Sequence, residues 1–98
     1  MFIRIVKMTF EPEKIADFLA NFEMHKNAIR HFEGCHFLEL YRGRDIENIF
    51  FTYSFWEDEE ALEAYRASAL FREVWSATKQ WFSEKPEAWS VDKIESLP

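Results

Sequence analysis

Residues 49–71, IFFTYSFWEDEEALEAYRASALF, decide the fold, because an aromatic strand runs directly into an acid-capped helix. Along residues 49–56 successive side chains point to opposite faces, as in any strand. One face would carry Ile49, Phe51, Tyr53 and Phe55, and the other Phe50, Thr52, Ser54 and Trp56. Large apolar groups on both faces predict a strand in the middle of a sheet that is covered on both sides. Helices would cover one face, and a second subunit is the candidate for the other.

The acidic run at residues 57–60 marks the start of a helix. Carboxylates there supply N-cap oxygens and negative charge to a helix N-terminus. We interpret the run as capping and solvation rather than as a catalytic pair of carboxylates. Ser68 would cap a further helical segment that ends before Pro86.

The rest of the chain predicts three more strands and one long helix. Residues 2–10 are rich in β-branched and aromatic residues, which is typical of a strand. Pro12 suits the first turn of a helix, whose apolar residues recur at helical spacing until Gly34. Residues 35–42 and 88–94 alternate as strands do. The order predicts an α+β, ferredoxin-like βαββαβ fold with a four-stranded antiparallel sheet, in one domain spanning residues 1–98.

Composition narrows the function classes. Twelve Lys and Arg against eighteen Asp and Glu give a net charge of −6, which opposes binding to nucleic acid or to an anionic membrane. Cys35 is the only cysteine, so neither an intrachain disulfide nor a two-cysteine metal motif is expected. With no signal-like segment, we expect a cytoplasmic protein. Eleven Phe and four Trp exceed the needs of a small core, so the surplus is expected to line a cavity or an interface.

The chain resembles the antibiotic biosynthesis monooxygenase family of dimeric α+β barrel proteins. The resemblance rests on the strand IVKMTF followed by Pro12 and a long helix, on the turn at residues 32–35, and on residues 53–57 followed by Ala61, Leu62, Ser68 and Phe71. It implies a homodimer through sheet-on-sheet packing and a pocket between sheet and helices. It also implies that a small aromatic or quinol-type ligand is oxidised there by O2 without a cofactor.

The same resemblance includes departures from the family pattern. Active relatives often carry His where this chain has Tyr65 and Leu70, which favours a noncatalytic small-molecule-binding or structural dimer as the alternative function. In haem-degrading relatives an axial His falls at Trp75 and an Asn falls near Val6. Neither residue present here can ligate or polarise haem, so haem degradation is disfavoured.

Three polar residues are candidates for catalysis. Arg4 lies among apolar neighbours on the first strand and is a candidate to stabilise a substrate anion, with an intersubunit ion pair as the alternative. Tyr65 offers a phenol that can hydrogen-bond a substrate oxygen. His36 shares a predicted strand face with Leu38 and Leu40, which makes it a pocket candidate.

Four aromatic residues are the expected substrate-binding groups: Tyr53, Trp56, Phe71 and Trp75. Trp56 leads into the helices that carry Phe71 and Trp75, so these rings are expected near one pocket. Ordinary core packing is the alternative role for each of them. No metal site is predicted, because the three His are dispersed and lack a partner ligand at a recognised spacing.

Overall fold

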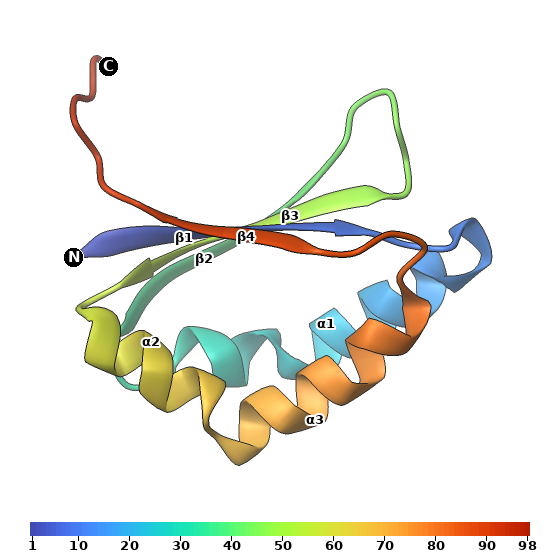
Figure 1. Ribbon diagram of the computed structural model, residues 1–98, viewed down its shortest axis with the longest axis horizontal. Coiled ribbons are helices and arrows are strands. Elements are labelled where there is room, and N and C mark those ends of the chain that lie inside the picture. Colours follow the sequence, from blue (N-terminus) through green and yellow to red (C-terminus); the bar gives the residue numbers. More distant parts are fainter.

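Four strands form a single antiparallel sheet in the order β2-β3-β1-β4 in the computed structural model, which describes residues 1–98. The strands are β1 (Phe2–Thr9), β2 (Cys35–Arg42), β3 (Ile49–Trp56) and β4 (Glu87–Val91). The helices α1 (Ile15–Arg30), α2 (Glu59–Arg66) and α3 (Ala69–Thr78) all lie against one face of the sheet (Figure 1). The predicted α+β, ferredoxin-like fold is therefore confirmed. None of the helices has the length and hydrophobicity of a membrane-spanning segment.

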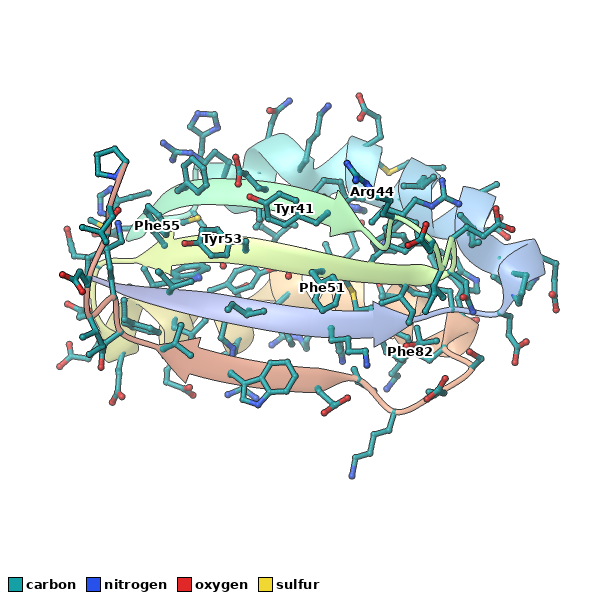
Figure 2. All side chains as sticks on the ribbon, turned by 90° about the horizontal axis from the view of Figure 1, so that it is seen from above. Tyr41, Arg44, Phe51, Tyr53, Phe55 and Phe82 are labelled. Atoms are coloured by element: carbon teal, nitrogen blue, oxygen red, sulfur yellow. The ribbon has the colours of Figure 1, made fainter.

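Strand β3 lies inside the sheet, paired with β1 on one side and β2 on the other. Its helix-facing side chains include Phe50 and Trp56, which are only 2% and 1% exposed. On the opposite side, which we call the open face, Phe51, Tyr53 and Phe55 are half-buried and stand clear of the helices (Figure 2). The two apolar sides of this strand thus meet different surroundings within one chain.

The buried core consists of two neighbouring clusters between the sheet and the helices. The larger cluster joins the sheet to α1 through Met8, Phe10, Ile15, Phe18 and Phe50. In it the rings of Phe10 and Phe18 stack with centroids 4.2 Å apart. The smaller cluster joins β2 and β3 to α2 through Cys35, Trp56 and Leu62. Removing large apolar side chains from water in this way supplies the main drive to fold.

Side-chain caps define where α2 and α3 begin. Asp58 accepts a hydrogen bond from the Ala61 amide at 2.8 Å, and Ser68 accepts one from the Phe71 amide at 3.1 Å. These are the two caps expected from the sequence, and they split the second helical region into two helices. The second of these is shorter than expected, because α3 ends at Thr78 and a 3-10 turn, η2 (Lys79–Trp81), follows it.

Both ends of the first helical region also differ slightly from the prediction. A 3-10 turn, η1 (Pro12–Lys14), precedes α1, and α1 stops four residues before Gly34. Gly34 has a φ of 90°, and a Cβ atom there would lie only 2.3 Å from the Cβ of Ala61. Glycine therefore allows both the turn and the close approach of α2.

The last strand is shorter than expected. Pairing between β4 and β1 runs from Glu87 opposite Lys7 to Val91 opposite Ile3. The first strand begins at Phe2, only one residue beyond Ile3, so residues 93 and 94 have no strand residue opposite them. Beyond Val91 the chain is exposed and rises on the open side of the sheet (Figure 1).

Candidate functional site

A cavity of about 270 Å³ lies between the helix-facing side of the sheet and the helices. Of its twenty lining residues, thirteen are hydrophobic, so it suits a largely apolar ligand. The sheet contributes, among others, Arg4, Val6, Leu38, Thr52, Ser54 and Trp56. Helices α2 and α3 contribute, among others, Leu62, Tyr65, Arg66, Phe71, Val74 and Trp75.

Four aromatic rings form a continuous wall of this cavity. Trp56 stacks on Tyr65 with ring centroids 5.1 Å apart, and Tyr65 meets the edge of Phe71 at 5.2 Å. Phe71 in turn stacks on Trp75 at 5.7 Å. Phe71 and Trp75 are four residues apart on α3, so both point to one side of it, and the break at Ser68 places them beside Tyr65. We call these four rings the aromatic wall.

Buried hydrogen bonding fixes the first ring of the aromatic wall. The Trp56 indole nitrogen donates to the Ser54 hydroxyl oxygen at 3.0 Å, so the buried N–H has a partner. The Ser54 hydroxyl in turn lies 3.5 Å from the Arg4 carbonyl oxygen on the neighbouring strand. A ring held at its polar edge keeps one orientation, here stacked on Tyr65.

Tyr65 keeps its proton under all ordinary conditions. Burial raises the pKa of the Tyr65 hydroxyl to about 12, and the nearby Cys35 thiol adds to the effect. No hydrogen bond within the protein uses this hydroxyl. A neutral phenol at the cavity can therefore donate a hydrogen bond to a ligand oxygen.

Arg4 brings a positive charge from the sheet to the same cavity. Its Nη1 donates to the Ser90 hydroxyl oxygen at 3.0 Å on β4. Burial lowers the pKa of the guanidinium, the charge of Arg66 lowers it further, and Glu63 acts in the opposite direction. Arginine nevertheless stays a cation at neutral pH and can stabilise a ligand anion.

Two of the predicted site residues lie away from the cavity. Tyr53 stands on the open face, where its ring meets those of Phe37 and Tyr41 at centroid distances of 6.2 Å (Figure 2). His36 is exposed, and its Nε2 lies 3.3 Å from a carboxylate oxygen of Glu57. A β-bulge between Cys35 and Phe37 breaks the alternation of β2, so the expectation that His36 shares a face with Leu38 does not hold.

The structure therefore brings five of the seven predicted site residues to one cavity: Arg4, Trp56, Tyr65, Phe71 and Trp75. It adds Arg66, which the sequence interpretation missed. Arg66 follows Leu62 by four residues on α2, and that spacing could have indicated a shared face. No group of three or more His, Cys, Asp or Glu side chains is placed to hold a metal ion.

The fold and the cavity together define a small ferredoxin-like protein with an aromatic pocket between its sheet and its helices. A family model for antibiotic biosynthesis monooxygenase matches residues 1–76. The chain belongs to this family, as its resemblance to it predicted. No curated protein matches the chain significantly by sequence.

Solved structures share the whole fold at low sequence identity. A conserved protein from Methanosarcina mazei Go1 is 23% identical, with a TM-score of 0.88 over 95% of this chain and 93% of that one. An antibiotic biosynthesis monooxygenase is 18% identical, with a TM-score of 0.91 over 97% of this chain and all of that one. A Mycobacterium tuberculosis protein is 13% identical, with a TM-score of 0.88 over 99% and 98%. Such similarity establishes the fold alone.

Proposed function

We propose that this protein is a cofactor-independent monooxygenase that oxidises a small aromatic or quinol-type compound with O2. The aromatic wall carries the proposal, because it offers stacking surfaces for a planar ring beside two polar groups, Tyr65 and Arg4. Family membership supports the same reaction class. The two polar groups can act on an oxygen of the ring while the ring itself stacks on the aromatic wall.

The size of the cavity narrows the substrate. Ligand pockets commonly have volumes of roughly 300–1,000 Å³, so about 270 Å³ lies just below that range. A compound with a single ring or with two fused rings fits this space better than a larger polycyclic system. We therefore place a mono- or bicyclic quinol or phenol against the aromatic wall.

The chemistry needs no external reductant. The phenol or quinol, in its keto tautomer, carries two hydrogens on one ring carbon, and loss of one proton to solvent leaves an electron-rich anion. Transfer of one electron to O2 and combination of the two radicals form a carbon–oxygen bond. Proton uptake and cleavage of the O–O bond then release water and leave a carbonyl. The two C–H bonds supply all four electrons that reduce O2.

Tyr65 and Arg4 would stabilise the substrate anion in this sequence. The neutral Tyr65 phenol and the Arg4 guanidinium are both donors, and a negatively charged oxygen accepts strongly from each. Stabilising the anion lowers the pKa of the substrate, so solvent suffices as the proton acceptor. The partly enclosed cavity strengthens both interactions by limiting water.

Oxygen uptake with a panel of quinols and anthrones tests this function. We expect uptake with at least one small quinol, and a fall in kcat of about 10²-fold when Tyr65→Phe removes one donor. Tyr41→Phe is the matched control, because Tyr41 is 48% exposed on the open face and its hydroxyl bonds Glu39. No uptake with any compound that binds would refute the enzymatic proposal.

A noncatalytic binding protein is the second candidate function. The observation in its favour is that no His lines the cavity, although active relatives often carry two His, at the positions of Tyr65 and Leu70. Such a protein would bind the same ring compounds without consuming O2. Calorimetric binding together with zero oxygen uptake would select this function over the first.

We also propose that the open face forms a homodimer by sheet-on-sheet packing. This face carries half-buried Phe37, Phe51 and Phe55, and Trp89 is 44% exposed. A broad exposed apolar surface of this kind marks an interface, and family members are typically dimeric. Two such faces would pack about 10 Å apart, as sheets do.

Light scattering tests the dimer. We expect a mass of about twice the 11.9 kDa of one chain. Trp89→Lys should shift the mass to that of a monomer, because it places a charge on the apolar face. The matched control is Met24→Lys, since Met24 is 76% exposed on α1, on the helical side. A wild-type monomer would refute the proposed dimer.

A further inference from the structure

Two arginines reach the same aromatic cavity from opposite sides. Arg4 comes from β1 in the sheet and Arg66 comes from the last turn of α2. The Arg66 side chain is 48% exposed, so it lies where the cavity meets solvent. An apolar cavity needs no cation for its own stability, and the proposed oxidation accounts for Arg4 alone.

The positive charge of this pair is only partly compensated. Arg66 Nη1 lies 3.2 Å from a carboxylate oxygen of Glu63, whose side chain is 67% exposed. Arg4 makes no ion pair, and its guanidinium donates only to the neutral Ser90 hydroxyl. Glu87 also lines the cavity, but its carboxylate pairs with Lys7 at 3.8 Å. The two guanidinium groups thus share the single Glu63 carboxylate, and about one positive charge at the cavity stays uncompensated.

An uncompensated, partly buried cation is unfavourable, and a second cation beside it adds repulsion. Burial and the charge of Arg66 lower the pKa of Arg4 and outweigh the opposite effect of Glu63, which agrees with both effects. A ligand anion placed between the two guanidinium groups would relieve them. Guanidinium groups bind carboxylates through paired hydrogen bonds, so each arginine offers suitable donor geometry.

We propose that the cavity takes an aromatic carboxylic acid, whose ring lies against the aromatic wall and whose carboxylate lies between Arg4 and Arg66. This inference rests on the proposed function and adds the class of substrate. Before the ring loses its proton, the single negative charge of a carboxylate matches the one uncompensated positive charge. Once the ring anion forms, the five N–H donors of Arg4 serve both the carboxylate and the ring oxygen, which Tyr65 also contacts. A phosphate monoester would bring about −1.5 to −2 and leave an excess of negative charge.

Calorimetric titration with 1-naphthoate and the neutral isostere 1-naphthamide tests the proposal. Neither compound is a quinol or an anthrone, so binding is measured apart from turnover. We expect 1-naphthoate to bind the wild-type protein about tenfold more tightly, which corresponds to about 1.4 kcal/mol. The preference should shrink to about threefold or less in Arg4→Gln and, separately, in Arg66→Gln, with little change for 1-naphthamide.

Arg44→Gln is the matched control, because Arg44 is exposed in the loop between β2 and β3, away from the cavity (Figure 2). It should keep the full preference for 1-naphthoate. Circular dichroism checks that each variant is folded, and Arg66→Gln on the exposed helix end serves if Arg4→Gln does not fold.

Each of the following results would overturn the inference. Equal affinity for the two ligands would leave an aromatic pocket with no anion site, and a preference that survives in both arginine variants would place the anion elsewhere. Tighter binding of 1-naphthyl phosphate than of 1-naphthoate would exclude the carboxylate. If neither naphthalene ligand binds while quinols still drive oxygen uptake, the inference of a carboxylic acid substrate is wrong and the proposed oxidation stands. If uptake is also absent, the proposed function fails with it.

Discussion

Replacing Gly34 with alanine probes how closely the start of β2 packs against α2. Gly34 has a φ of 90°, and holding an L-residue there costs about 1–2 kcal/mol. The new Cβ would also lie 2.3 Å from the Ala61 Cβ, and relieving such overpacking costs about 1–3 kcal/mol. We expect the free energy of unfolding to fall by about 2–5 kcal/mol, a large part of the roughly 5–15 kcal/mol typical of proteins.

Ala61→Gly separates the steric part of this loss from the backbone part. Alone it should cost about 1 kcal/mol, since glycine disfavours the helix. In the double variant the clash is gone, so Gly34→Ala should cost about 1–3 kcal/mol less in that background than in the wild type. Urea unfolding followed by circular dichroism measures all four proteins at one fixed concentration, because the stability of a dimer depends on concentration. If the stability losses of the two single variants added up to that of the double variant within about 0.5 kcal/mol, the proposed clash would be refuted.

Three further predictions concern the cavity and its helices. Because burial raises the pKa of Tyr65 from 10.0 to about 12, its contribution to stability is complete below pH 10. The free energy of unfolding, measured by urea titration, should fall by about 2–3 kcal/mol between pH 10 and 12. Tyr65→Phe should remove this fall. Asp58→Ala deletes the α2 cap and should lower the unfolding free energy by about 1 kcal/mol, whereas an unchanged urea midpoint would contradict the capping role. Added haemin should keep the Soret band of free haemin, because no His lines the cavity; a shifted band with reductant-dependent turnover would argue for haem chemistry.

Most of the fold was predictable because local signals agreed with one another. The apolar sides of β3 indicated an interior strand, and Asp58 and Ser68 marked helix starts that the structure retains. The aromatic wall followed from helical spacing, which puts Phe71 and Trp75 on one side of α3. Strand boundaries were less predictable, because β4 ends at Val91, opposite Ile3 and near the start of β1, and not where its own alternation ends.

The misplaced site residues have specific physical causes. The bulge in β2 adds one residue, which breaks the alternation of side chains between the two faces of the sheet. No residue type in that stretch signals such a bulge. His36 was therefore assigned to the face of Leu38. Tyr53 and Trp56 alternate to opposite faces, and the pattern of one strand does not tell which face the helices cover. Arg66 was missed because a charged residue at a helix end is normally assigned to solvent.

Strand β3 also constrains how this protein can acquire new specificity during evolution. A substitution at Trp56 or Ser54 alters the cavity, while one at the neighbouring Phe55 or Tyr53 alters the open face. Both kinds of substitution fall on one strand, whose backbone is hydrogen-bonded to β1 on one side and to β2 on the other. Helices α2 and α3 line the cavity without pairing in the sheet, so they can vary more freely. We expect relatives with different substrates to diverge mainly in α2 and α3 and to keep the apolar character of β3.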